Sequence, residues 1–152
     1  MVRSVTLEIP GEPMGEPRKR VTNVDGAGRP LRFPRHYDAP KAARQKAVIG
    51  QYALKAMNDA GLSLFTGPVG VLIEVVLACP RSRWRKKAPV GRKRSTSKPD
   101  YDNVEKMLLD ACEGIVYAND SQCFGEGCGK WIGAQGERPY LRVRFTEYPE
   151  GE

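Results

Sequence analysis

The residues best suited to chemistry lie within positions 98–122. Asp100 and Asp102 stand two residues apart, Lys106 follows one helical turn later, and Asp120 comes after a short apolar segment. Carboxylate oxygens are the ligands that Mg²⁺ prefers, and a lysine can stabilise charge on a phosphate. A bound Mg²⁺ can in turn activate water. With the basic residues just upstream, this pattern favours hydrolysis of a phosphodiester bond.

The elements that must position these carboxylates can be predicted locally. Pro99 disfavours helix at the preceding residue, so the chain should enter Asp100 extended. In a strand-like phase, Asp100 and Asp102 would point the same way. Asp102 or Asn103 is a natural N-cap, and the predicted helix covers residues 104–115.

A simpler explanation covers part of this pattern. Asp100 and Asp102 can serve only to cap the helix, and Lys106 can pair with Asp110 four residues on. This explanation leaves Asp120 and the upstream cations without a role. The residues alone therefore leave both a metal-dependent nuclease site and an ordinary helix start open.

Two basic segments, at about 10–38 and 81–98, are predicted to be loops. The first contains Asp25-Gly26, a strong hairpin signal, and the second contains no acid. A chain with net charge +7 favours a polyanionic partner. The first segment is either a phosphate-binding arm or a flexible connector. In the second, Trp84 either stacks on a base or sugar or folds back onto the core. The cations predicted to bind nucleic acid are Arg18, Lys19, Arg20, Arg83, Arg85, Lys86, Lys87 and Lys98.

The remaining elements indicate an α+β fold. Strands are predicted at residues 3–9, 68–79 and 139–147, the second being central, and a helix at 40–60, which Asp38 could cap. Glycines break a weak strand signal at 123–124 and 130–132. We therefore expect one domain over the 152 residues. Its small mixed β-sheet has two main helices packed on it, in the order strand, helix, strand, helix, strand, strand.

Other classes of site find little support. No apolar run reaches the ~20 residues of a membrane span, and the N-terminus does not read as a signal peptide, so a cytoplasmic location is expected. The four cysteines are best interpreted as free thiols. A zinc site formed by Cys112, Cys123, Cys128 and His36 is conceivable, but zinc-ligand spacing is absent.

The segment KPDYDNVEKMLLDACEGIVYANDSQ resembles the signature of the RusA family of Holliday junction resolvases. That family carries a D-x-D-N-x-x-K-x-x-x-D-A-L-x-G pattern followed by D-D-x-Q. The early GEPMGEPRKR resembles the family's N-terminal G-x-P loop. The positions that match the signature are Asp100, Asp102, Asn103, Lys106, Asp110, Ala111, Gly114, Asp120 and Gln122.

The resemblance implies a RusA-like homodimeric endonuclease of bacterial or prophage origin that cuts four-way DNA junctions. It would use Mg²⁺ or Mn²⁺, without a small-molecule cofactor and away from membranes. Its metal-binding and catalytic carboxylates would be Asp100, Asp102 and Asp120, and its essential lysine Lys106. These carboxylates should converge in one pocket with Lys106, and Asp110 should lie behind Lys106 as its partner.

Two departures from the family pattern bear on these expectations. Asn119 stands where the first aspartate of D-D-x-Q is usual, and Cys112 replaces a leucine at a position expected to face the core. Asn119 and the mobile basic segments leave a second hypothesis open, a protein that binds junctions or single strands without cutting. A third is a nuclease for flaps, forks or RNA.

Overall fold

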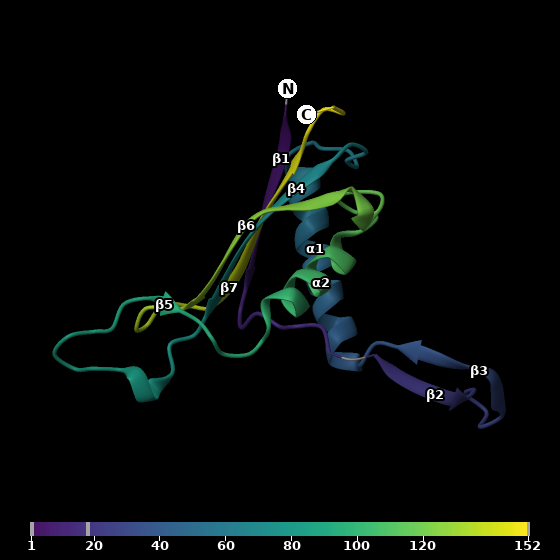
Figure 1. Cartoon of the computed structure of the whole chain (residues 1–152), viewed down its shortest axis with the longest axis horizontal. Helices are drawn as coiled ribbons and strands as arrows, with labels where there is room; N and C mark the ends of the chain where they lie inside the picture. Colours follow the sequence, from purple (N-terminus) through teal and green to yellow (C-terminus); the bar gives the residue numbers. More distant parts are fainter. Residues whose placement is uncertain (1, 18, 152) are drawn as a thin grey trace.

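The computed structural model describes residues 2–17 and 19–151 and shows a mixed sheet covered on one face by two helices (Figure 1). The sheet has the strand order β1-β7-β4-β6-β5, with β4 and β6 parallel and the other neighbours antiparallel. The strands are β1 (Arg3–Pro10), β4 (Val69–Leu77), β5 (Lys93–Arg94), β6 (Cys123–Ile132) and β7 (Tyr140–Glu147). The helices are α1 (Pro40–Asp59) and α2 (Tyr101–Cys112). The expected α+β class and the mixed sheet are confirmed.

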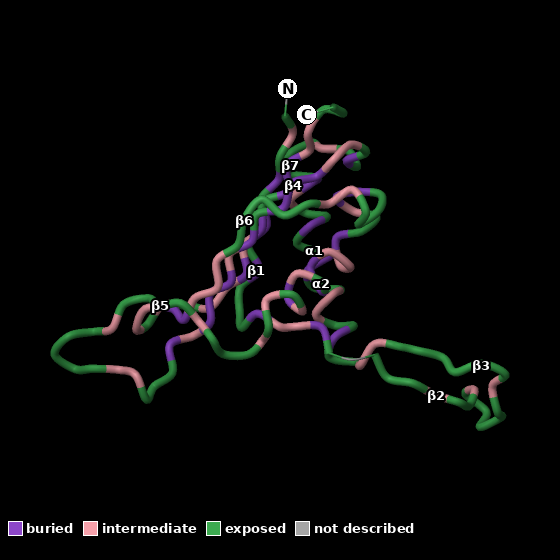
Figure 2. The backbone as a smooth tube through the Cα atoms, in the orientation of Figure 1, coloured by how far each residue is buried: buried purple, intermediate pink, exposed green. Residues whose placement is uncertain are grey.

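The core lies between the helices and the sheet (Figure 2). Alternate residues of β1 and β7 face it, and the apolar run of β4 places that strand at the centre of the sheet, as expected. Helix α1 contributes an apolar stripe of Ala42, Ile49, Ala53 and Met57. Cys112 of α2 is fully buried, so the expected core position is confirmed.

The opposite face of the sheet is open. There Arg142 of β7 pairs with Glu8 of β1 and Glu74 of β4, each at 3.1 Å. Leu72 of β4 is 36% exposed on this side. β4 is thus less fully covered than its apolar run suggested. None of the helices in the described residues is long and apolar enough to cross a bilayer.

The sequence predicted two separate strand pieces, at 123–124 and 130–132, but β6 runs through both of them. It is continuous, and its pairing with β4 shifts register between Val71 and Leu72, which face Gly125 and Gly127. Glu126 is the extra residue of this β-bulge. The glycines therefore mark an irregularity within one strand, because the ladder with β4 holds the backbone extended on both sides of it.

Two segments project from this body (Figure 1). One is a hairpin of β2 (Arg20–Val24) and β3 (Pro30–Tyr37), which form a separate two-stranded sheet. Asp25 Oδ1 accepts from the amides of Ala27 and Arg29, both at 2.9 Å, so the expected hairpin turn is confirmed. The other is the segment 80–98, with the 3₁₀ turn η1 (Arg81–Arg83) and β5.

Candidate active site

Helix α2 begins three residues earlier than the sequence predicted. Asp100 is its N-cap residue, without a side-chain capping bond, and the helix starts at Tyr101. Asp102 therefore lies in the first helical turn, not in an extended segment. Residues two apart on a helix do not face each other. The prediction that Asp100 and Asp102 point the same way was wrong for this reason.

One face of α2 lines a pocket of about 250 Å³. Asp102, Glu105, Lys106, Leu109 and Asp110 follow the i, i+3, i+4, i+7, i+8 spacing of a single helical face. Asp120, from the 3₁₀ turn η2 (Asp120–Gln122), completes the lining. The structure thus brings Asp102, Lys106 and Asp120 together in what we call the acidic pocket.

Asp100 does not line the acidic pocket. Both of its carboxylate oxygens lie 2.9 Å from Nζ of Lys98, and this hydrogen-bonded ammonium lowers the pKa of Asp100. Within residues 2–17 and 19–151, no three acidic, histidine or cysteine side chains are arranged as metal ligands. The convergence of all three aspartates is therefore not found in this structure. The ion pair is exposed, and such pairs contribute little and are easily exchanged.

The turn that holds Asp120 is fixed by Asn119 and Gln122. Asn119 Oδ1 accepts from the Ser121 amide at 2.9 Å, and Gln122 Oε1 accepts from the Asn119 amide at 2.8 Å. Gln122 Nε2 also donates to the carbonyls of Phe65, at 3.0 Å, and Gly67, at 2.9 Å. The N-D-x-Q sequence therefore acts as a capping box that is tied to the chain entering β4.

A lysine that the sequence analysis missed stands behind the acidic pocket. Nζ of Lys46 lies 2.7 Å from Glu16, 3.2 Å from Asp38 and 3.4 Å from Asp110. Burial alone would lower the pKa of Lys46, but hydrogen bonds to Glu16 and Asp38 outweigh it and raise the pKa to about 12. Asp110 shares the pocket with Lys106, yet its ion-pair partner is Lys46.

The prediction that Asp38 caps α1 was wrong, because Asp38 belongs to this cluster instead. The N-cap of α1 is Ala39, without a side-chain capping bond, because Asp38 is engaged by Lys46. The sequence held one signal for this cluster. Lys46 lies one helical turn from buried Ala42 and Ile49, so it is a cation within the apolar stripe of α1.

The N-terminal loop packs on the beginning of α2. The Glu16 amide donates to the Asn103 carbonyl at 3.0 Å, and Gly15 is so close that a Cβ there would lie 3.1 Å from Cβ of Pro99 and of Asn103. A second pocket beside the acidic one is lined by Glu16, Pro17, Lys19, Asn103 and Lys106. Lys19, predicted from sequence to bind nucleic acid, therefore lies next to Lys106.

The other predicted nucleic-acid cations are distributed over the two projecting segments. Arg18 lies outside the described residues. Arg20 opens β2 and is exposed, while Arg83, Arg85, Lys86 and Lys87 follow one another in the 80–98 segment. Trp84 folds back onto this segment. Its indole N–H donates to the Cys79 carbonyl at 3.3 Å, and the guanidinium of Arg81 lies 4.0 Å from its ring.

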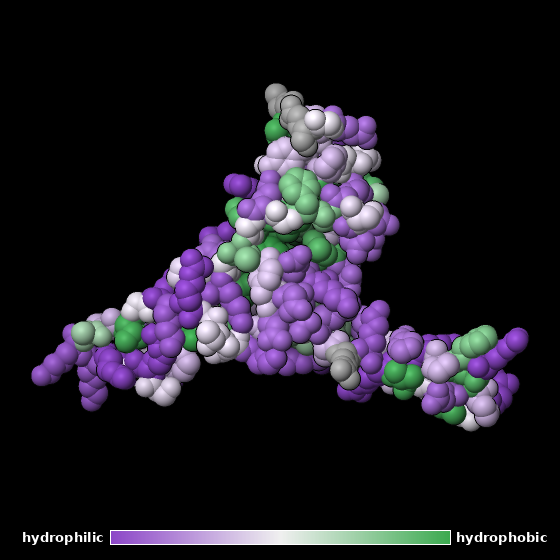
Figure 3. All heavy atoms as spheres, in the orientation of Figure 1, coloured by the Kyte–Doolittle hydropathy of each residue, from purple (hydrophilic) through white to green (hydrophobic). Residues whose placement is uncertain are grey.

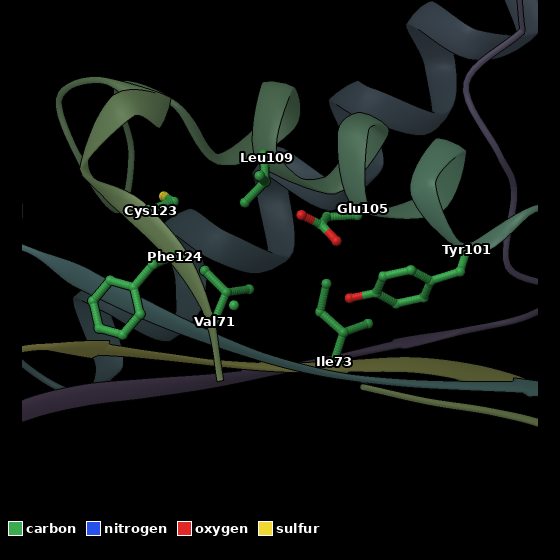
Figure 4. Close-up of a pocket in the computed structure, with 8 residues that line it drawn as sticks. Val71, Ile73, Tyr101, Glu105, Leu109, Cys123 and Phe124 are labelled. Carbon is green, nitrogen blue, oxygen red and sulfur yellow. The ribbon is translucent and has the colours of Figure 1, made fainter. Parts of the chain in front are cut away.

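A small pocket adjoins the acidic one and shares Glu105 and Leu109 with it (Figure 4). Its floor is formed by Val71 and Ile73 of β4, and Tyr101 points its hydroxyl toward Glu105. Burial and then the Glu105 carboxylate raise the pKa of Tyr101. Tyr101 therefore stays neutral, with its hydroxyl facing the Glu105 carboxylate.

The donors around the acidic pocket suit a hard cation. Asp102, Glu105, Asp110 and Asp120 present only oxygen, and Lys106 is the single cation among the lining residues. Mg²⁺ and Mn²⁺ are bound by such carboxylates together with water and phosphate oxygens. The alternative zinc site is not formed, since His36 lies on the hairpin and the cysteines in the described residues are free thiols.

Comparisons with known proteins identify the family of the chain. A family model described as endodeoxyribonuclease RusA matches residues 10–144, which include every residue of the acidic pocket. The chain is also similar to a protein of Bacillus subtilis (strain 168), the uncharacterized protein YqaN. The two are 30% identical over 148 residues, which cover 94% of this chain and 96% of the relative.

Proposed function

Because the chain belongs to the endodeoxyribonuclease RusA family, we propose that it is a metal-dependent endonuclease that resolves four-way DNA junctions by phosphodiester hydrolysis. The observation that supports this most directly is the acidic pocket. It places Asp102, Asp120 and Lys106 on one surface. A basic chain with such a local concentration of carboxylates needs an account beyond helix capping.

Asp102 and Asp120 are the proposed metal ligands, and Asp100 is the third ligand that the family resemblance implies, although Lys98 pairs with it outside the pocket. A divalent ion held there would supply an activated water and neutralise charge developing on the phosphate. Asp110 and Glu105 keep the pocket negative, while Lys46 balances Asp110 from behind.

Lys106 is proposed to stabilise the reacting phosphate. Its side chain is exposed and lines both the acidic pocket and the neighbouring one with Lys19. Within the described residues it forms no ion pair, so the ammonium remains available to a phosphate oxygen. Hydrogen bonds from an ammonium to developing negative charge are strong contributors to catalysis.

The proposed substrate follows from where the cations lie. The two basic projections leave the body on opposite sides of α2 (Figure 1). DNA that touches both would therefore span α2, the helix that supplies most of the lining of the acidic pocket. We propose a homodimer in addition, since two symmetry-related strands of a junction are addressed naturally by two sites related by a two-fold axis.

A protein that binds DNA without cutting it was suggested by Asn119 together with the mobile basic segments. In the structure Asn119 caps η2 through its side-chain oxygen, which an aspartate would do equally well. The substitution therefore gives no support to loss of catalysis, and the endonuclease is the better proposal.

The test is cleavage of a labelled four-way junction with Mg²⁺ by purified wild-type protein and three variants. We expect symmetric cutting by wild type and losses of at least about a hundredfold for Asp102→Asn and Asp120→Asn. Asp59→Asn, an exposed acid at the end of α1, is the matched control and should cut normally. The proposal would be contradicted if wild-type protein did not cut the junction, or if Asp102→Asn still cut it.

A further inference from the structure

The hairpin of β2 and β3, here called the arm (residues 19–37), is not explained by packing within the chain. It forms a separate sheet, and nearly all of its strand residues are exposed (Figure 2). A two-stranded hairpin that packs on nothing is marginally stable in water. Such an arm gains a defined position chiefly by covering, or being covered by, a partner.

The arm combines cations with aromatic rings. Opposed residues of an antiparallel pair point to the same side, and the register sets Arg20 opposite Tyr37 and Thr22 opposite Arg35. Phe33 lies between Arg35 and Pro30 of β3, where the register of the pairing shifts. Phe33 is 72% exposed, the largest exposure of any large hydrophobic residue in the described part of the chain.

The charge of the arm identifies the class of partner. It carries Lys19, Arg20, Arg29, Arg32 and Arg35 against a single acid, Asp25, which Arg29 already pairs at 2.9 Å. A nucleic acid, as a polyanion, would be attracted to this surface. Figure 3 shows hydrophobic and hydrophilic residues side by side over the arm, the combination expected where bases and phosphates are both met.

The base of the arm is anchored beside the acidic pocket. Glu16 precedes the arm and Asp38 follows it, and both pair with Lys46, which also reaches Asp110 of the pocket. Glu16 is buried, so this anchor is not a loose surface contact. The residues that flank the arm are therefore tied to Asp110 of the acidic pocket through Lys46.

We propose that the arm enters the branch point of the DNA. There Phe33 stacks on a base left open by the junction, and Arg20 and Arg35 contact the adjoining phosphates. The choice of branched DNA rests on the proposed endonuclease function. Two-stranded ribbons fit DNA grooves, and stacking on an aromatic ring tolerates any base, so the contact selects structure and not sequence.

The experiment measures binding without metal, so that no cutting occurs. Fluorescence anisotropy is recorded with a fixed four-way junction and with a linear duplex of the same sequence at equal salt. Phe33→Ser should weaken junction binding about tenfold and duplex binding less than twofold. Phe33→Trp should keep junction binding. Arg35→Ala should reduce the slope of log affinity against log salt by about one. Leu54→Ser removes a 53% exposed apolar side chain from α1 and should leave the binding of both the junction and the duplex unchanged.

Two results would overturn the proposal. Equal affinities of Phe33→Ser and wild type for the junction would remove the stacking contact. Loss of a dimer in sedimentation by Phe33→Ser would assign the arm to a second copy of the chain. The outcome is separable from the endonuclease proposal because it requires no cleavage. If the protein binds junctions through Phe33 but does not cut them, the arm proposal stands and the endonuclease proposal fails. If the protein cuts junctions but its binding does not depend on Phe33, the endonuclease proposal stands and the arm proposal fails.

Discussion

At the scale of single residues, the two aspartates of the D-x-D pair have different surroundings. Asp102 shares the acidic pocket with Asp120 and Lys106, whereas Asp100 is held by Lys98. The sequence identified all four residues but not this division, because it depends on where α2 begins. A shift of three residues in the helix start turns a strand-like pair into two residues on different sides of a helix.

Asn119 gives the first prediction at this scale. Asn119→Asp should cleave junctions within about twofold of wild type, because aspartate and asparagine cap helices equally well. Asn119→Ala loses the bond to the Ser121 amide and should lower the free energy of unfolding by about 1 kcal/mol. Urea unfolding and junction cleavage of both variants give the measurement. Strong activation by the aspartate would mean that its charge acts in the site.

Lys46 gives the second prediction at the scale of single residues. Lys46→Met leaves Glu16, Asp38 and Asp110 without their shared cation, and Glu16 is buried. Removing one partner of a buried ion pair costs about 3 kcal/mol, which urea unfolding at pH 7 should show. Lys46→Arg keeps the charge and should lose less than half as much. Equal losses in the two variants would show that packing, and not charge, is what Lys46 contributes.

At the scale of elements, sequence patterns predicted the strands and helices well and their junctions poorly. The alternation in β7 and the apolar run of β4 report burial directly. The bulge in β6 and the start of α2 depend on contacts with distant segments. Those contacts are the ladder with β4 and the packing of Gly15 against Pro99 and Asn103.

The turn η2 tests how an element positions a functional side chain. Gln122→Ala removes bonds to the carbonyls of Phe65 and Gly67 and to the Asn119 amide. Unfolding free energy should fall by about 2 kcal/mol. Cleavage should fall further than stability explains, because Asp120 loses its support. Gln45→Ala, on α1, is the matched control. Cleavage at the wild-type rate by folded Gln122→Ala would show that Asp120 needs no such anchor.

Glu147 at the end of β7 gives a prediction on acid stability. Burial would raise the pKa of Glu147, but the amides of Gly67 and Thr66 and the guanidinium of Arg3 lower it overall. A group with a lowered pKa stabilises the fold at pH values above its ordinary pKa of 4.5. This stabilisation is lost as the pH falls through the pKa that the group has in the folded protein. Glu147→Gln should therefore cost about 1 kcal/mol at pH 7 and almost nothing at the lowest pH.

Urea unfolding of wild type and Glu147→Gln between pH 3 and pH 7 gives the comparison. The difference between them should shrink as the solution is acidified. A constant difference across this range would mean that shape, and not ionisation, is what the carboxylate contributes. Glu150→Gln, beyond the end of β7, should leave the pH dependence unaltered.

At the scale of the whole molecule, charge is sorted by region. The acidic pocket lies on the body, and cations gather on the two projections beside it (Figure 1). Composition alone showed the net charge of +7 and the basic segments, so a nucleic-acid partner could be predicted. The direction of the projections could not, because it is fixed by distant contacts such as those of Lys46 with Glu16 and Asp38.

The 80–98 segment provides the test of this arrangement, because Lys86 and Lys87 at its exposed end take part in no ion pair with another described residue. If they meet phosphates, Lys86→Ala/Lys87→Ala should weaken junction binding at low salt and reduce the salt slope by about two. Thermal stability should be unchanged, since neither lysine touches the core. Lys55→Ala, an exposed cation on α1, should leave the slope unaltered. A double variant with the wild-type slope would place the DNA away from this segment, and the acidic pocket would then be approached from the arm alone.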